Sequence, residues 1–410
     1  MLVRLRSALK RSLILITSFT CMILVMVGTM PSLMTHALPE PTIKIMVVGD
    51  SISHGGAGDW TWRYRLWQHL MSSGTSVDFV GPFNTLYDYS NGSFYNQDYI
   101  DPNFDRDHDA TAGRMATDEK NTIAGYVATY TPNTPNTTNI LLINLGTNDM
   151  GWFGMTGQQV ASQMYALITN ARTANPNIKI VLSKITPRLS PGADYTARWT
   201  DYNNWLGVLA STMDTAQSPI VLADPVTGFD PAVDTWDATH PSPSGEYKIA
   251  AAFANGLANP KIGVGTSYGA IPTAPAWPLA PITVTGTPAD GAATVTWNAM
   301  PGAFGYYVYM RQAGSTGPFT QLNASQTTDL TYTVGSLVNG QHYEFTVSTV
   351  RGYFTGPKST SVFITPQPRQ RPAPTTPQMP TTPTRPVPTI PQIPTPTDRP
   401  RPTSTTPQFP

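Results

Sequence analysis

Between residues 42 and about 262, short apolar runs alternate with segments whose apolar residues recur at helical spacing. The apolar runs predict strands at residues 43–48, 77–80, 139–145, 178–184 and 219–222. The helical spacing predicts helices at residues 60–71, 157–174 and 195–213, and a last helix opens after Ser242 with proline in its first turn. Such alternation is typical of an α/β domain with a parallel sheet between two helical layers. Functional residues then gather where the strands end.

The hydrophobic pattern changes after residue 262. Residues 263–280 are rich in Gly, Pro and Ala and are interpreted as a linker. Within residues 281–366, apolar and polar positions alternate with period two between turn residues, which is typical of an all-β sandwich. Trp297 lies in the second such run, and Tyr343 follows a leucine by six residues. These features resemble a fibronectin type III domain, in which Tyr343 would form the tyrosine corner.

The C-terminal residues 367–410 consist almost entirely of Pro, Thr, Gln and Arg. They lack the apolar residues of a core, so we expect an extended, disordered tail. Its five Arg against one Asp would suit contact with anionic cell-wall polymers. The alternative is a solvated spacer.

The N-terminal residues 1–37 have the pattern of an export signal. Four basic residues precede an apolar stretch from Leu13 to Val27, and small residues at 35–37 offer a cleavage point. The alternative is an uncleaved anchor, since about 20 apolar residues span a membrane. Polar, proline-rich sequence follows at once, which favours cleavage. We therefore expect a secreted, extracellular protein without stable membrane insertion, and association with the cell wall is an open alternative.

Charge and cysteine content narrow the function further. The formal net charge of the 410-residue chain is zero, so nothing indicates a nucleic-acid partner. Removing the signal removes 4 of the 25 Lys+Arg and none of the 25 Asp+Glu, which leaves a net charge of −4. The only cysteine, Cys21, goes with the signal. The mature protein therefore has neither disulfides nor a catalytic cysteine.

Three short segments carry candidate chemistry at predicted strand ends or loops: Gly49-Asp50-Ser51, Gly146-Thr-Asn148-Asp149 and Asp237-Ala-Thr-His240. A serine hydroxyl needs a hydrogen-bonded base to become a nucleophile, and histidine suits that task. An aspartate three residues earlier can bond the far ring nitrogen and fix its tautomer. The sequence thus predicts a catalytic triad of Ser51, Asp237 and His240, which needs neither a cofactor nor a metal.

These residues resemble the conserved blocks of the SGNH (GDSL-like) hydrolase superfamily. Ser51 matches the nucleophile block, Asn148 the G-x-N-D block, and Asp237 with His240 the D-x-x-H block. The remaining block is a single loop glycine, for which Gly113 is the best candidate. The resemblance implies a flavodoxin-like, three-layer fold with a five-stranded parallel sheet. It also implies an oxyanion hole formed by the backbone N–H groups of Ser51 and Gly113 and the Asn148 side chain.

Finer features are similar to family three of the carbohydrate esterases: residues 43–51, 77–81, 107–108 and 236–240. Members of that family remove acetyl groups from xylan. The resemblance therefore implies an acetylated polysaccharide, or a small ester, as substrate. The β-sandwich would act as a spacer or as a contact to polymer or cell wall. Two departures lie near the expected cleft: Arg114 stands where an aromatic residue is expected, and the loop at residues 82–106 is long.

Several features have two interpretations. Asp50 and Asp149 are expected to be structural. The acidic residues 105–109 could bind a hard cation or could form a polar loop that positions Gly113. The aromatic residues of the long loop could form a carbohydrate platform or could pack the loop onto the domain: Tyr87, Tyr89, Phe94, Tyr95 and Tyr99.

The rival functions are a lipase or acyltransferase on the same triad, and a non-catalytic carbohydrate or cell-wall binding protein.

Overall fold

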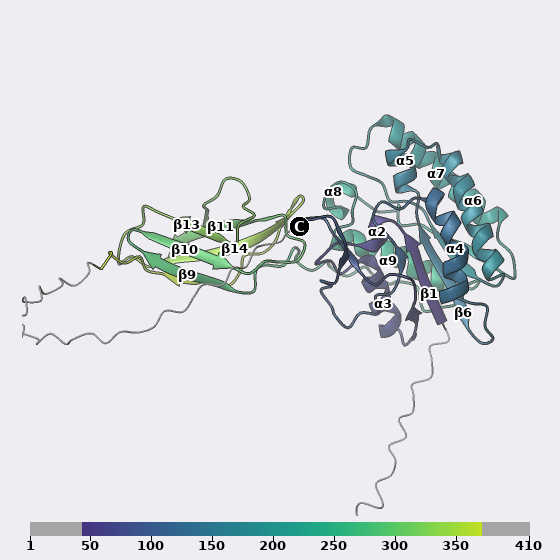
Figure 1. The fold of residues 1–410 in the computed structure, drawn as a ribbon, viewed down its shortest axis with the longest axis horizontal. Coiled ribbons are helices and arrows are strands. Elements are labelled where there is room, and N and C mark those ends of the chain that lie inside the picture. Colours follow the sequence, from purple (N-terminus) through teal and green to yellow (C-terminus); the bar gives the residue numbers. More distant parts are fainter. Residues whose placement is uncertain (1–42, 371–410) are drawn as a thin grey trace, which may run out of the picture. The chain divides into compact units, whose positions relative to one another are not determined.

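The first part of the chain folds around a parallel sheet in the computed structural model, which describes residues 43–370 (Figure 1). The strands lie in the order β2 (Asp78–Phe79), β1 (Ile43–Gly49), β6 (Thr138–Asn144), β7 (Lys179–Ser183) and β8 (Ile220–Ala223). A two-residue strand, β5 (Asp109–Ala110), also pairs with β1, at its carboxyl end. Counted along the chain, the five main strands have the order 2-1-3-4-5, which is that of flavodoxin-like folds. The predicted fold class is confirmed.

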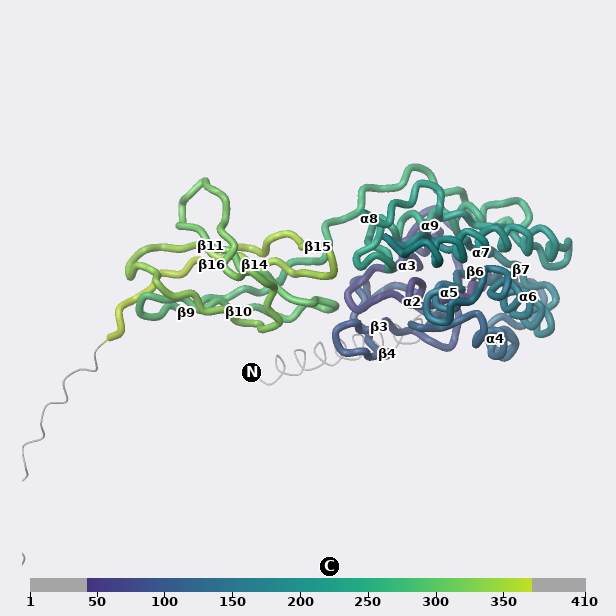
Figure 2. Tube along the Cα trace, turned by 90° about the horizontal axis from the view of Figure 1, so that it is seen from above, coloured from purple at the N-terminus to yellow at the C-terminus, as the bar shows by residue number. Residues whose placement is uncertain are grey.

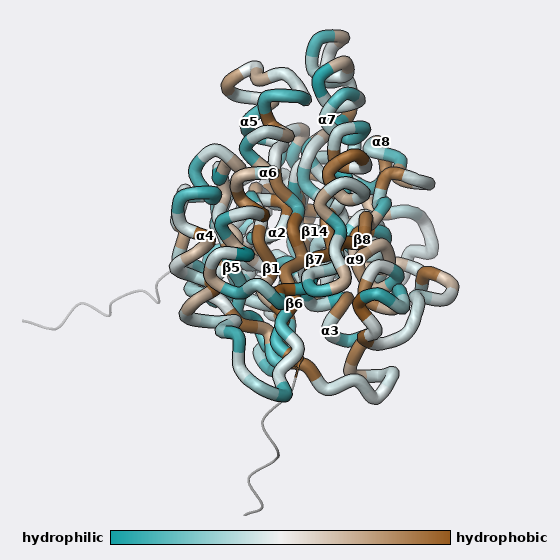
Figure 3. Tube along the Cα trace, turned by 90° about the vertical axis from the view of Figure 1, so that its right-hand side faces the viewer, coloured by the Kyte–Doolittle hydropathy of each residue, from teal (hydrophilic) through white to brown (hydrophobic). Residues whose placement is uncertain are grey.

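Helices cover both faces of this sheet (Figure 1). One face packs against α3 (Trp62–Ser72) and α9 (Pro243–Ala258), and the other against α4 (Ala116–Tyr130), α6 (Gly157–Ala174) and α7 (Ala193–Thr212). Because side chains alternate along a strand, Ile45 of β1 joins the α3–α9 layer and Met46 joins the opposite one. Figure 3 shows β1, β6 and β7 as hydrophobic strands in the middle of the domain. Strands buried on both faces explain the continuous apolar runs in the sequence.

Two short helices begin where adjacent strands end. Helix α2 (Ser51–His54) follows β1, and α5 (Thr147–Trp152) follows β6, its neighbour in the sheet. The chain crosses to opposite sides of the sheet after these two strands, which makes this edge the topological switch point. A third short helix, α8 (Pro231–Asp234), precedes α9. The switch point therefore brings together the segments that contain Ser51 and Asn148.

Three local features differ from the sequence prediction. The helix expected at residue 60 begins at Trp62, because the Thr61 hydroxyl caps it by accepting from the Tyr64 N–H at 3.3 Å. Helix α4 was not predicted, because few of its residues are buried and they form only a thin apolar stripe. The long loop contains a hairpin of β3 (Leu86–Asp88) and β4 (Ser93–Asn96).

The second domain is a two-sheet sandwich (Figure 2). One sheet contains β9 (Val284–Ala289), β10 (Ala292–Trp297) and β13 (Thr331–Val334). The other contains β11 (Gly305–Gln312), β12 (Thr320–Gln321), β14 (Tyr343–Arg351), β15 (Phe354–Thr355) and β16 (Val362–Ile364). Trp297 is buried between the sheets, and the Tyr343 hydroxyl accepts a hydrogen bond from the Val338 N–H at 3.1 Å. That bond is the predicted tyrosine corner.

The segment interpreted as a linker is partly packed. Val264 joins the core beneath α3 and α9, and Trp277 is 7% exposed and contacts Phe354 of the sandwich. The described residues through Gln367 form one compact unit. The predicted signal and most of the predicted tail lie outside the described residues. Across residues 43–370, no helix is both long and apolar enough to cross a membrane.

Candidate active site

Ser51 is the first residue of α2, directly after the turn that ends β1. Asp50 precedes it in an extended conformation, and its Oδ1 accepts the Ile52 N–H at 3.0 Å, which caps the helix. Complete burial raises the pKa of Asp50 to about 6, against the opposing effect of the Ile52 hydrogen bond. Asp50 thus fixes the backbone at Ser51, which is the kind of structural role that was predicted for it.

The structure brings the three predicted triad residues into one hydrogen-bonded chain. His240 Nε2 lies 2.9 Å from Ser51 Oγ, and His240 Nδ1 lies 2.7 Å from Asp237 Oδ2. Asp237 Oδ1 also accepts the backbone N–H groups of Thr239 at 3.1 Å and His240 at 2.8 Å. Partial burial raises the pKa of Asp237, but these hydrogen bonds outweigh it and the pKa is lowered overall. The carboxylate is therefore charged where it faces the imidazole.

Two aromatic rings surround the imidazole of His240. The Trp236 indole is stacked on it at 5.4 Å between centroids, and Tyr89 meets it edge-on at 4.9 Å. The segment that holds His240 is a tight turn, because Ala238 has φ of +75° and the Trp236 N–H donates to the His240 carbonyl at 2.9 Å. The turn and the rings limit the orientations of the ring that contacts Ser51.

The candidate oxyanion residues are tied to one another and to α2. The Thr111 N–H donates to the Gly49 carbonyl at 3.1 Å, which holds the Gly113 loop beside the nucleophile turn. Gly113 has φ of +83°, which a larger residue would adopt only with strain. Asn148 Nδ2 donates to the Arg114 carbonyl at 2.9 Å. One N–H of the amide thus holds the loop.

His54 supports this loop and was missed by sequence reasoning. Its buried ring accepts the Ala112 N–H on Nδ1 at 3.1 Å. Burial, followed by the charges of Arg63 and Arg114, lowers the pKa of His54 to about 3. The ring therefore stays neutral and keeps its acceptor. The only signal in the sequence was its place three residues after Ser51, which alone predicts nothing.

Asp149 has the structural role that was expected. Its carboxylate accepts the N–H groups of Ala116 at 2.9 Å and Thr117 at 3.2 Å, and also the Thr117 hydroxyl at 2.9 Å. Acidic groups at a helix N-terminus satisfy its free N–H groups. Asp149 therefore fixes the start of α4 directly after the Gly113 loop.

Arg114, the residue found in place of an aromatic, forms a buried cluster with two carboxylates. Its Nη1 contacts Asp109 Oδ1 and lies 2.6 Å from Glu119 Oε2. Burial raises the pKa of Glu119 to about 9 and also raises the pKa of Asp109, against the attraction of Arg114. Two carboxylates beside a single guanidinium retain one proton between them. The cluster thereby fixes the position of Arg114, whose backbone carbonyl accepts the hydrogen bond from Asn148 Nδ2.

The acidic segment 105–109 uses its side chains within the protein. Asp105 Oδ2 accepts the Phe79 N–H at 2.7 Å, and the buried His108 contacts the Thr85 carbonyl at 2.9 Å and accepts the Ala110 N–H at 3.0 Å. No group of three or more His, Cys, Asp or Glu in the described part of the chain is placed to hold a metal ion. These contacts favour the interpretation of a loop that positions Gly113.

The aromatic residues of the long loop divide between the two interpretations. Tyr87 packs on Tyr89 and Phe94, and Tyr99 is buried. Phe94 and Tyr95 are 40% and 78% exposed and remain candidates for ligand contact.

Sequence reasoning missed an exposed aromatic pair after Asn148, namely Trp152 and Phe153, at 67% and 63% exposure. The Trp152 ring lies beside Gly113, 3.1 Å from where a side chain would begin.

Family models match two parts of the chain. Residues 47–247 match the GDSL-like Lipase/Acylhydrolase family, and residues 278–365 match the fibronectin type III domain. The chain contains a GDSL-like SGNH hydrolase domain followed by a fibronectin type III domain.

Individual relatives match parts of the chain. A multidomain esterase of Ruminococcus flavefaciens is 27% identical over 226 residues, which are 51% of this chain and 27% of that protein, so the chain spans about a quarter of its length. A family 3 carbohydrate esterase from Talaromyces cellulolyticus is 30% identical, with a TM-score of 0.44, over 54% of this chain and 100% of that one. An Fn3-like protein from Clostridium thermocellum is 29% identical, with a TM-score of 0.19, over 21% of this chain and 90% of that one.

Proposed function

We propose that this chain is a secreted serine esterase that removes O-acetyl groups from a polysaccharide through an acyl-enzyme. The observation that carries the proposal is the continuous hydrogen-bonded chain from Asp237 through His240 to Ser51. Both bonds have the lengths expected of a nucleophile, its base and the group that orients the base.

The first half of the reaction forms the acyl-enzyme. Ser51 Oγ attacks the ester carbonyl carbon while His240 Nε2 takes the hydroxyl proton. Asp237 holds the proton on Nδ1 and stabilises the imidazolium. The tetrahedral intermediate then collapses, its C–O bond to the alcohol breaks, and His240 gives the proton to the leaving alcohol.

The second half releases the acid. Water attacks the acyl carbon and gives a proton to Nε2 of His240. Collapse breaks the bond to Ser51 Oγ, which regains that proton. Both tetrahedral intermediates carry an oxyanion, which the N–H groups of Ser51, Gly113 and Asn148 would bind. One such donor typically contributes about 3–4 kcal/mol to lowering the barrier. These steps use no cofactor or metal.

The exposure of the triad supports a polymeric substrate. The side chains of His240 and Asp237 are 17% and 29% exposed, so the triad is partly accessible to solvent. Trp152 stands exposed beside Gly113, and aromatic faces offer apolar platforms at a wet surface. An acetyl group is small enough to react at such a site while the sugar chain stays outside. The fibronectin type III domain and the C-terminal tail would contact polymer or cell wall.

The test is acetate release from acetylated xylan and from an aryl acetate by the exported chain and its Ser51→Ala variant. We expect release from both substrates by the wild type and from neither by the variant. Cleavage of the aryl ester alone would keep the mechanism and refute the polysaccharide substrate. A folded wild type that cleaves neither would refute the esterase mechanism and favour a binding protein.

A further inference from the structure

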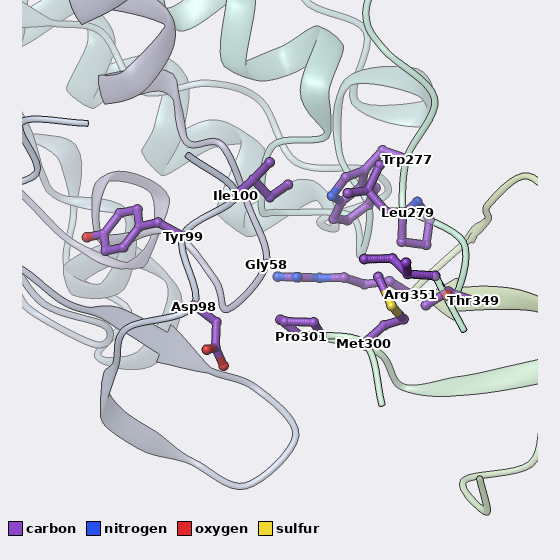
Figure 4. A pocket seen from close by; sticks show the side chains of 12 residues that line it. Gly58, Asp98, Tyr99, Ile100, Trp277, Leu279, Met300, Pro301, Thr349 and Arg351 are labelled. Atoms are coloured by element: carbon purple, nitrogen blue, oxygen red, sulfur yellow. The ribbon is translucent and has the colours of Figure 1, made fainter. Parts of the chain in front are cut away.

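Arg351 lies at the end of β14 in the fibronectin type III domain, but its charge is buried against the hydrolase domain. Its side chain is 1% exposed and points toward the loop at Gly58 (Figure 4). Nη1 donates to the Ala57 carbonyl at 2.5 Å and lies 3.0 Å from Asp59 Oδ1, while Nη2 donates to Asp59 Oδ2 at 3.1 Å. A buried guanidinium that faces a buried carboxylate with both nitrogens is a specific contact.

The backbone beside Arg351 also approaches the hydrolase domain closely. The Tyr353 N–H donates to the Trp236 carbonyl at 2.8 Å. Gly352 has φ of +52°, and a side chain there would begin 2.0 Å from the same carbonyl. A side chain at Gly302 would likewise begin 2.0 Å from the Ala57 carbonyl oxygen. Two glycines are therefore required where the sandwich meets the segments around Asp59 and Trp236.

Trp236 links Arg351 to the catalytic histidine. The guanidinium lies 4.8 Å from the centre of the Trp236 ring, within cation–π range. The same indole is stacked on His240, and Tyr89 contacts both rings. Trp236 is 2% exposed, so its position depends on these neighbours. Arg351 itself touches neither Ser51 nor the reacting atoms.

We propose that Arg351 is a positioning residue for His240, so that the fibronectin type III domain is part of the catalytic unit. The proposal rests on the proposed function, because it concerns the orientation of the base in that mechanism. Without the guanidinium, the Trp236 indole loses its cation–π partner and keeps only its edge contact with Phe304 of the sandwich. The imidazole stacked on it then samples orientations that do not reach Ser51 Oγ. Proton transfer slows, while the substrate surface around Trp152 is unchanged.

The test compares full-length variants on an aryl acetate at pH 7. For Arg351→Met we expect kcat to fall about 10-fold or more, with KM within twofold, since misorientation by about 1 Å costs catalysis rather than binding. Arg351→Lys should lose less, because it keeps the charge without the planar fork. The matched control is Arg311→Met, which removes a sandwich arginine that pairs with Glu344 at 2.6 Å. We expect it to keep the wild-type kcat.

A double variant separates positioning from charge balance. Arg351→Met strands the buried Asp59 carboxylate, whereas Arg351→Met with Asp59→Asn removes both charges and avoids that penalty. We expect the double variant to regain the thermal stability of the wild type and to keep the loss of kcat. A double variant with wild-type kcat would overturn the proposal, because Arg351 would then act only as a counter-ion.

The remaining outcomes are equally decisive. Wild-type kcat in folded Arg351→Met would overturn the positioning role and leave the proposed function intact. An equal loss of kcat in Arg311→Met would also overturn it, since any damage to the sandwich would then suffice. A wild type without turnover, or whose turnover survives Ser51→Ala, would overturn the proposed function and this proposal with it.

Discussion

The Asp237→Asn substitution changes one atom of the proposed triad, and we expect it to cause a large loss of activity. The asparagine Oδ1 can still accept the backbone N–H groups of Thr239 and His240, which lie 3.1 and 2.8 Å from the aspartate oxygen. Its amide nitrogen would then take the place of Asp237 Oδ2, 2.7 Å from His240 Nδ1. Because that nitrogen donates, the imidazole must carry its proton on Nε2, which faces Ser51 Oγ. The base then has no lone pair for the serine proton.

The size of the effect follows from this wrong tautomer. An equivalent change in a buried serine triad lowers kcat about 10⁴-fold, which corresponds to about 5.4 kcal/mol of barrier. The Asp237 side chain is 29% exposed, so water partly replaces the lost acceptor. We therefore expect a fall of about 10³- to 10⁴-fold in kcat for an aryl acetate at pH 7, with little change in KM.

The control is Asp230→Asn, seven residues earlier. Asp230 caps α8 by accepting the Ala232 N–H at 3.0 Å, and asparagine caps a helix equally well. We expect this variant to have wild-type activity, and both variants to have melting temperatures near that of the wild type. Activity of Asp237→Asn within tenfold of the wild type, with the fold intact, would refute the assignment of Asp237 as the group that orients His240.

Three further predictions follow from the same structure. Asn148→Ala removes a candidate oxyanion donor and should lower kcat about 10²- to 10³-fold with KM little changed, as measured by steady-state kinetics. Glu119 holds a proton in the fold up to a pKa of about 9, whereas the unfolded chain releases it near pH 4.5. The free energy of unfolding should therefore fall as the pH rises through this window, by up to about 1.4 kcal/mol per pH unit. Glu119→Gln should lack this contribution, so urea unfolding at pH 5, 7 and 9 should give a shallower slope, and equal slopes would contradict the assignment. Phe253→Ala in the core should cost about 3–5 kcal/mol in urea unfolding, whereas Phe363→Ala, 62% exposed in the sandwich, should cost little.

The sequence was sufficient to predict the sheet and the three residues that form the hydrogen-bonded chain. Strands β1, β6 and β7 are buried on both faces, so each appears as an unbroken apolar run. The catalytic segments follow these runs or precede a helix with clear start signals. Because parallel strands end at one edge of the sheet, Ser51 and Asn148 could be expected to lie close together from the sequence.

The supporting residues could not be predicted in the same way. His54 and Arg114 act through contacts that depend on how loops pack, and no spacing in the sequence encodes such contacts. Helix α4 buries few residues, so its periodicity is weak. Arg351 is separated from Asp59 by 292 residues and belongs to another domain. A contact between residues so far apart in the sequence depends on how the two domains pack, so no local pattern predicts it.

The most direct test of the central claim is covalent trapping of the nucleophile with an aryl dialkyl phosphate, followed by intact-mass and peptide analysis. The account predicts one dialkylphosphoryl adduct per chain, on Ser51, formed in proportion to the loss of esterase activity. The Ser51→Ala chain should stay unmodified, and Asp237→Asn should react far more slowly. Complete inactivation with Ser51 unmodified, or full modification of Ser51 with activity retained, would contradict the account.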